Sequence, residues 1–266
     1  MIWDQIWMVI WTLLKIVAID INYLHQVDRA VRRLEKHQQN EGCSEKICLQ
    51  LISIYMQQNR IKDLIPLYKS LAKTTKKDIY VEKLIETYLY NKDFKGAIDF
   101  LEHDYHNDAL LYSLYMEEKN YLKAHALSQK LLLTTKDPKW HAESAISLYE
   151  SISNRDDKKV LNQVIKEFES ALKEGVKNPV YLNYYGYTLI EKDIDVKKGL
   201  SIVSKALDQE PENTYFLDSL AWGEYKLGNC SKAYKTMKKV VEVEGLKEKE
   251  IIEHWNAINN QCNTDK

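Results

Sequence analysis

The chain has 266 residues, of which 45% are hydrophobic and 29% are charged, but only 8 glycines and 4 prolines. This composition is typical of a folded, helix-rich protein and excludes the disordered and collagen-like classes. With 38 lysines and arginines against 39 aspartates and glutamates, the formal net charge is -1, so no nucleic-acid partner is expected.

Residues 6–19 form an apolar run that is interrupted only by Thr12 and Lys15. The run is shorter than the roughly 20 residues that span a bilayer, and no basic leader precedes it, so neither a spanning helix nor a signal peptide is expected. On a helix, the polar residues fall on one stripe and the tryptophans cover much of the rest. We expect a helix buried against the first repeats. The alternative is a membrane or oligomer contact through this helix.

Three segments further along share one internal pattern: a tyrosine, an aromatic or aliphatic residue six positions later, and a third landmark three positions after that. The three sets are Tyr55, Ile61 and Leu64; Tyr88, Phe94 and Ala97; and Tyr115, Tyr121 and Ala124. The pattern predicts a first helix closed by the tyrosine, a short polar turn and a second helix. It therefore indicates a helical hairpin repeated along the chain.

The C-terminal half repeats at a similar spacing. Gly186 and Ala221 lie 35 residues apart, Gly199 and Ala233 lie 34 apart, and Pro211 ends one hairpin before the next begins. Residues 247–259 then predict a capping helix that turns its apolar side chains, Ile251, Ile252 and Trp255, toward the last hairpin.

These residues resemble the tetratricopeptide repeat family. One repeat matches its motif at Leu182, Tyr185, Gly186, Gly199, Ala206 and Pro211, and the next at Leu217, Leu220, Ala221, Gly228, Ala233 and Met237. The resemblance covers roughly residues 43–260, and Leu182 to Val241 is especially similar to repeat proteins of exported bacterial type. It implies an all-α, right-handed superhelical solenoid of about six antiparallel helix pairs. Residues 1–42 would add an N-terminal apolar helix with a connecting helix, and residues 43–266 the array with its C-terminal cap.

The resemblance also implies that the chain binds a protein or peptide on the concave wall, which the first helix of each hairpin lines in this family. The candidate partner-binding residues are Tyr149, Asn183, Tyr187, Asp218, Trp222 and Tyr225. Aromatic rings anchor partners and an asparagine can hydrogen-bond a backbone. For Trp222 and Tyr225, packing against neighbouring repeats or the cap is an equal alternative. The basic clamp of chaperone-tail binders is absent, so a neutral or basic partner is expected.

The sequence contains no glycine-rich phosphate loop, paired zinc motif or nucleophile elbow. His103 and His106 come nearest to a metal pair, but no third ligand accompanies them. We therefore expect a protein-interaction scaffold with no catalytic, metal or cofactor site. The alternative function is a structural spacer, or a self-assembling or membrane-associated protein that acts through its tryptophan-rich N-terminal helix.

Cys230 lies in the turn of the last hairpin and Cys262 at the end of the predicted cap helix. If that helix runs parallel to the first helix of the hairpin, both cysteines lie at the same end and can form a disulfide. Cys43 and Cys48 could also pair. Paired cysteines indicate an exported, periplasmic or membrane-peripheral protein, whereas free cysteines indicate the cytoplasm. Both alternatives stay open.

Overall fold

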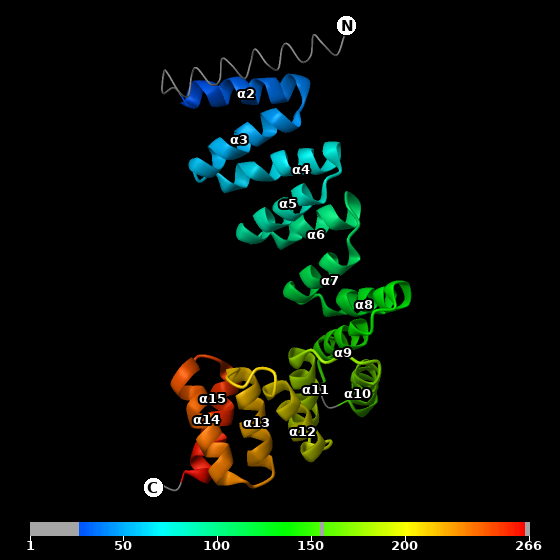
Figure 1. Ribbon diagram of the computed structural model, residues 1–266, viewed down its shortest axis with the longest axis vertical. Helices are drawn as coiled ribbons and strands as arrows, with labels where there is room; N and C mark the ends of the chain where they lie inside the picture. The colour runs from blue at the N-terminus through cyan, green and yellow to red at the C-terminus, as the bar shows by residue number, and fades with distance from the viewer. Residues whose placement is uncertain (1–26, 155–156, 264–266) are drawn as a thin grey trace. The chain divides into compact units, whose positions relative to one another are not determined.

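The computed structural model describes residues 27–154 and 157–263, and within them every regular element is a helix (Figure 1). The predicted N-terminal apolar helix falls in residues 1–26, outside the described residues, so its membrane or oligomer contact and the boundary after residue 42 stay predictions. Within the described ranges, no helix combines the length and apolar character needed to cross a membrane.

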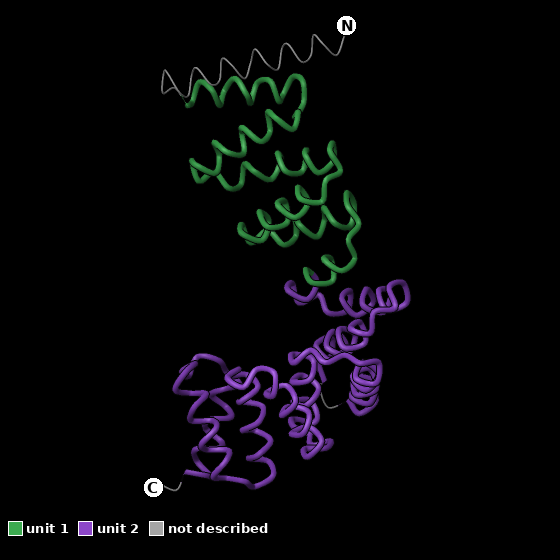
Figure 2. Tube along the Cα trace, viewed as in Figure 1, with its two compact units in different colours: residues 1–114 green, residues 115–266 purple. Residues whose placement is uncertain are grey.

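The chain divides into two compact units, residues 1–114 and residues 115–266 (Figure 2). In unit 1 the helices are α2 (Val27–Glu41), α3 (Glu45–Gln57), α4 (Leu64–Thr75), α5 (Asp78–Tyr90) and α6 (Phe94–His103). Helix α7 (Asp108–Glu117) contains the boundary. Unit 2 continues with α8 (Tyr121–Thr135), α9 (Lys139–Ser151), α10 (Lys158–Lys173), α11 (Pro179–Glu191), α12 (Val196–Leu207), α13 (Thr214–Lys226), α14 (Cys230–Glu244) and α15 (Lys249–Cys262).

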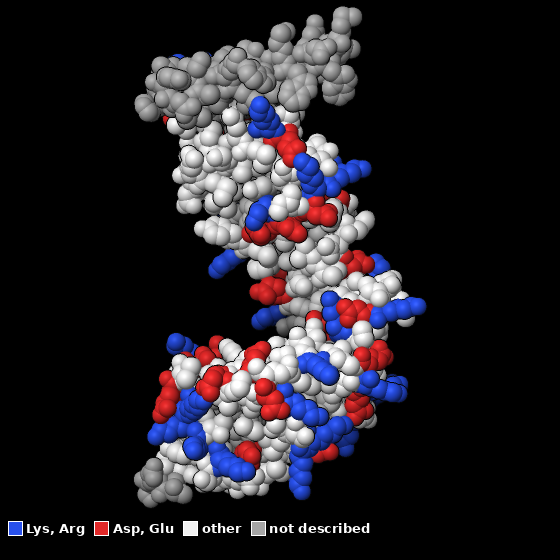
Figure 3. All heavy atoms as spheres, in the orientation of Figure 1, with Lys and Arg blue, Asp and Glu red and all other residues white. Residues whose placement is uncertain are grey.

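In chain order, α3 to α14 make six consecutive pairs, as the repeat pattern predicts, and α15 follows as the cap. Neighbouring helices pack on one another from α2 to α6 and from α8 to α15. Acidic and basic side chains are interspersed over the face of each unit that Figure 3 shows. The all-α repeat fold expected from the sequence is therefore confirmed.

The turns between paired helices explain the tyrosine landmarks. Arg60, Asp93 and Asn120 donate their backbone N–H groups to the carbonyls of the landmark tyrosines Tyr55, Tyr88 and Tyr115, at 2.8, 2.9 and 2.7 Å. The residue before each donor has a positive φ, as the last turn of a Schellman-type helix end requires. The landmark thus marks the carbonyl that closes the turn, and the spacing to the second helix follows from this geometry.

Helices α11 and α12 pack with their backbones close together. A Cβ atom added at Gly186 would lie 2.8 Å from the backbone oxygen of Gly199, and one added at Gly199 would lie 2.6 Å from that of Gly186. Both positions therefore need glycine, and the hairpin closes tightly enough to fix the direction of α11. Tyr185 of the same helix is buried and stacks on Phe168 of α10, with ring centroids 5.2 Å apart.

The cap helix α15 buries Ile251 and Ile258 against the last hairpin, where they join the core of Leu217, Ala221 and Met237. It runs parallel to α13, because Asp218 meets His254 near one end and Tyr225 meets Gln261 near the other. The cap thus lies alongside the first helix of the last pair, as the sequence predicts.

Candidate functional site

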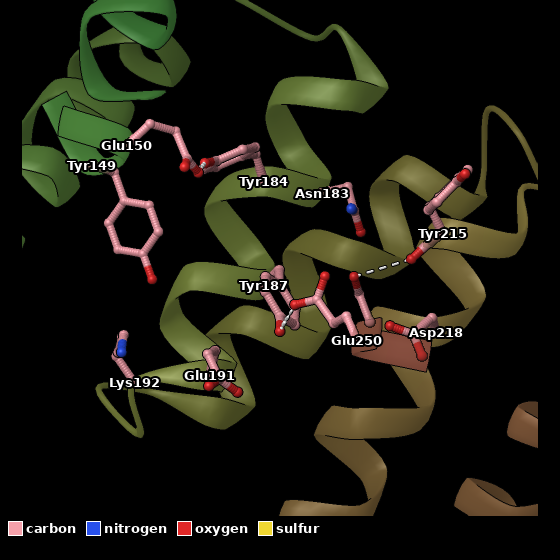
Figure 4. Close-up of a pocket in the computed structure, with 11 residues that line it drawn as sticks. Tyr149, Glu150, Asn183, Tyr184, Tyr187, Glu191, Lys192, Tyr215, Asp218 and Glu250 are labelled. Atoms are coloured by element: carbon pink, nitrogen blue, oxygen red, sulfur yellow. Dashed lines mark hydrogen bonds between the residues drawn. The ribbon is translucent and has the colours of Figure 1, made fainter. Parts of the chain in front are cut away.

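Unit 2 contains a hollow of about 290 Å³ lined by the first helices of three pairs and by the cap (Figure 4). Its walls come from α9 (Tyr149, Glu150), α11 and its last turn (Asn183, Tyr184, Tyr187, Glu191, Lys192), α13 (Tyr215, Asp218, Ser219) and α15 (Glu250). Four of the six candidate residues, Tyr149, Asn183, Tyr187 and Asp218, thus come together in one place. Trp222 and Tyr225 do not line the hollow.

Helix α11 supplies the largest share of this surface because its side chains repeat on one face. Asn183, Tyr187 and Glu191 follow one another at intervals of four and therefore lie above each other. The start of the helix is fixed by Asn178, whose side chain accepts the N–H of Val180 at 2.9 Å, and by Pro179 in the first turn. The Asn178 cap and Pro179 thus fix the residue at which α11 begins.

The acidic side chains of the first helices accept hydrogen bonds from the next first helix along the chain. Glu143 accepts from Tyr181 at 2.6 Å, and Glu150 accepts from Tyr184. In unit 1, the bond to Glu45 raises the pKa of Tyr80 to about 12. These bonds join neighbouring repeats. The repeat pattern does not predict these bonds, although a tyrosine 34 to 38 residues after a glutamate is a visible signal.

Two further hydrogen bonds border the hollow. Trp222 donates its indole N–H to Glu191 at 2.7 Å, and Tyr187 donates its hydroxyl to Glu250 of the cap. Burial, with the bond to Glu250, holds the pKa of Tyr187 well above its ordinary range. The phenol therefore stays a proton donor, and the carboxylate of Glu250 is held at the hollow.

Asp218 forms a buried pair with His254 of the cap at 2.9 Å, with side chains 8% and 5% exposed. The imidazole stacks on Trp222 at 4.2 Å between centroids, and Trp222 stacks on Tyr225 at 5.1 Å. Tyr225 also donates to Gln261 at 2.7 Å. Trp222 and Tyr225 thus contact the cap, which is the arrangement that the packing alternative describes. Their role in binding stays a prediction.

Asn183 carries a buried acceptor that is not satisfied within the described chain. Its side-chain oxygen Oδ1 is inaccessible to solvent and has no hydrogen-bond partner among the described residues. Figure 4 shows this side chain directed into the hollow, between Tyr184 and Glu250. A buried polar atom without a partner costs about 1–3 kcal/mol, so this oxygen lowers the stability of the fold unless a donor reaches it.

The four cysteines lie in two pairs. The Cα atoms of Cys230 and Cys262 are 4.9 Å apart and those of Cys43 and Cys48 are 5.6 Å apart, both within the range of disulfide bonds. These distances allow a disulfide in each pair, and the bonds themselves stay a prediction. The compartment that would follow from this pairing stays a prediction.

The described residues contain no group of three or more histidines, cysteines, aspartates or glutamates that could hold a metal ion. His103 places its Nδ1 atom 3.0 Å from the backbone oxygen of Asp99 and 3.3 Å from its carboxylate, and His106 is exposed. Both histidines therefore lie at the surface, His103 at the end of α6 and His106 in the connection to α7.

Two solved structures have a fold similar to that of this chain. A tetratricopeptide repeat protein from Parabacteroides merdae is similar over 93% of this chain and 97% of its own, with a TM-score of 0.53 and 15% sequence identity. A chain of the APC/C hetero-tetramer Cut9–Hcn1 is similar over 92% of this chain and 51% of its own, with a TM-score of 0.58 and 12% identity. No family model and no curated protein sequence matches. The chain has the tetratricopeptide repeat fold.

Proposed function

We propose that this protein is a non-catalytic scaffold whose hollow in unit 2 binds a segment of a partner protein. The observation that carries the proposal is the buried, unpartnered oxygen of Asn183. A peptide backbone or a polar side chain offers N–H groups that can donate a hydrogen bond to such an acceptor. Four tyrosines line the same hollow, and aromatic walls are the usual anchors of protein interfaces.

The charges of the hollow favour a neutral or basic partner. Four carboxylates and one ammonium group line it. An acidic segment would meet like charges there, which is unfavourable for association. The fold supports this proposal without choosing the partner, since the same repeats serve many processes.

Photocrosslinking tests the proposal. A crosslinking amino acid replaces Tyr215, which is 58% exposed at the edge of the hollow, or Leu133, which is 79% exposed on α8 outside it. We expect one discrete crosslinked partner from position 215 and none of it from position 133. Equal labelling from the two positions would mean that the partner does not use the hollow.

A pair of substitutions then ties the crosslink to the site. Asn183→Leu removes the acceptor with little change in volume, whereas Asn162→Leu makes the same change at an exposed position of α10. We expect the first to abolish the crosslink from position 215 and the second to leave it intact. Circular dichroism confirms that both variants keep their helices. A crosslink that survives Asn183→Leu in a folded protein contradicts the proposal.

A further inference from the structure

The hollow presents acceptors from three helices to whatever enters it. Asn183 and Glu191 come from α11, Asp218 from α13 and Glu250 from the cap α15. These groups have oxygens that accept hydrogen bonds, and a carboxylate has no donor when ionised. A ligand that satisfies them must therefore bring several N–H or O–H donors.

The negative charges at the hollow are held in place by neutral donors. Glu191 accepts from the indole of Trp222, and Glu250 accepts from the phenol of Tyr187. Such donors orient a carboxylate but carry no positive charge. Burial raises the pKa of Tyr187, and the charges of Glu250, Glu191 and Asp218 add to the effect, so this ring lies in a negative field.

Two lysine ammonium groups, those of Lys226 and Lys192, bear on the charge of the hollow. The ammonium of Lys226 lies 2.8 Å from Asp193 and 2.9 Å from the backbone oxygen of Glu191, away from the glutamate carboxylate. The ring of His254 contacts Asp218 through Nδ1 at 2.9 Å and stacks on Trp222. Lys192 lines the edge of the hollow as one ammonium against four carboxylates. The lining therefore favours a cation.

Aromatic rings complete the walls. Tyr149 and Tyr184 meet edge to face, with centroids 6.2 Å apart, and Tyr215 lies exposed at the edge of the hollow. A cation over the face of such a ring is attracted by its electrons. At about 290 Å³, the hollow lies at the small end of ligand pockets, so its size suits one side chain.

We propose that the hollow receives the guanidinium group of an arginine side chain from the partner segment, an inference that rests on the proposed function. A guanidinium carries five N–H donors in a planar fork, which matches acceptors on three helices and stacks on tyrosine. The ammonium group of lysine is a compact point charge and reaches fewer of them at once. Asn183 Oδ1 and the carboxylate of Glu250 are the two acceptors that the arginine engages.

Peptide libraries test this assignment on the full chain. Four sets of short random peptides carry arginine, citrulline, lysine or glutamate at one fixed central position and are passed over the immobilised protein. Citrulline keeps the shape of arginine without its charge. We expect the arginine set to be retained about tenfold better than the citrulline set, as a charge-assisted hydrogen bond implies. Mass spectrometry of the eluted peptides gives the ratio.

Matched variants locate the effect. Glu250→Gln removes one of the four carboxylates of the hollow but keeps an acceptor for Tyr187. Glu253→Gln makes the same change on the same helix, where the side chain is 63% exposed. We expect the preference for arginine over citrulline to fall toward unity in the first variant only. Melting curves verify that both variants are folded.

The outcomes separate the two proposals. If peptides are retained but arginine and citrulline bind equally, the arginine assignment is wrong and the scaffold proposal stands. Equal retention of the lysine and arginine sets overturns the choice of a guanidinium. If no set is retained by the folded protein, both the arginine assignment and peptide binding by this hollow are wrong.

Discussion

Trp222 connects three parts of unit 2 through one side chain. Its indole N–H bonds to Glu191 of α11, and its ring is stacked between His254 of the cap and Tyr225 of its own helix. The ring is half-buried. Removing it takes away a hydrogen bond, two stacked contacts and apolar burial together.

We therefore expect Trp222→Ala to lower the free energy of unfolding by about 3 kcal/mol, at the low end for large-to-small aromatic substitutions. Urea denaturation followed by circular dichroism measures the change. Tyr215→Ala, at a position 58% exposed, is the control and should change it by less than about 0.5 kcal/mol. Equal effects of the two substitutions would show that the contacts of Trp222 with the cap add no stability.

His125 gives unit 2 a defined response to acid. Burial lowers the pKa of His125 below the ordinary value of 6.5, and its Nδ1 lies 3.1 Å from the backbone oxygen of Ser144, which it reaches as a donor. The unfolded chain therefore takes up this proton at a higher pH than the folded chain. Between the two pKa values the unfolded state binds more protons, so stability falls as the pH falls below 6.5.

His125→Gln keeps a donor for that carbonyl but does not titrate. We expect the variant to lose less unfolding free energy than the original protein between about pH 7.5 and about pH 5.5. The comparison needs denaturation curves at both pH values. Parallel pH profiles for the original protein and His125→Gln would refute the expectation.

At the scale of helices, the turns of the hairpins carry left-handed residues that are mostly not glycine. Asn59, Lys92 and Lys119 have φ values of 56°, 56° and 58°, whereas Gly228 occupies the same place in the last hairpin at 78°. A side chain in this conformation crowds the backbone, at a cost of about 1–2 kcal/mol relative to glycine. Each of these turns thus contains a local penalty that the hairpin packing outweighs.

Lys92→Gly should remove that penalty at an exposed site and raise the free energy of unfolding by about 1 kcal/mol. The matched control is Lys238→Gly, at an exposed position inside α14, which should lower it by about 1 kcal/mol. Thermal melts of the two variants give the signs. A loss of stability at both positions would mean that the left-handed turn does not decide the effect.

The hairpins with the tyrosine landmarks were predictable because their turns share one length. The tyrosine landmarks coincide with the carbonyls that close the turns, so counting from Tyr88 places the start of α6 at Phe94. The cap was expected at residues 247–259 and runs from Lys249 to Cys262. The contacts between repeats were not predictable in this way. Among the contacts that join successive first helices, the donors are tyrosine, tryptophan or lysine, and the separations to the acceptors vary from 31 to 38 residues.

The candidate site was partly predictable for a related reason. Helical periodicity alone brings Asn183 and Tyr187 to one face, so both were found from sequence. Glu250 was missed because it reaches the hollow from the cap, and that approach depends on how α15 packs on α13. Tyr184 was missed because it lies beside the predicted stripe and turns toward Glu150.

At the scale of the whole molecule, the two cysteine pairs link stability to the redox state. The pair Cys230–Cys262 encloses a loop with a sequence separation of 32, which the chain-entropy model values at about 3–4 kcal/mol. We expect Cys262→Ser to lower the unfolding free energy of the oxidised protein by that amount and that of the reduced protein much less. A thiol count on the denatured, non-reduced protein precedes the comparison. Four free thiols there would contradict the paired arrangement.

The connection between α14 and the cap has a practical consequence. Leu246 is 50% exposed, and Lys247 beside it is also exposed, so a protease that cuts after lysine can reach this segment. With Cys230 and Cys262 joined, the severed C-terminal piece stays attached and would leave only on reduction. The piece carries Glu250 and His254, so it could be exchanged for a synthetic peptide. Isotopic labels or unnatural side chains could then enter the hollow by semisynthesis, with the remainder of the protein made by cells.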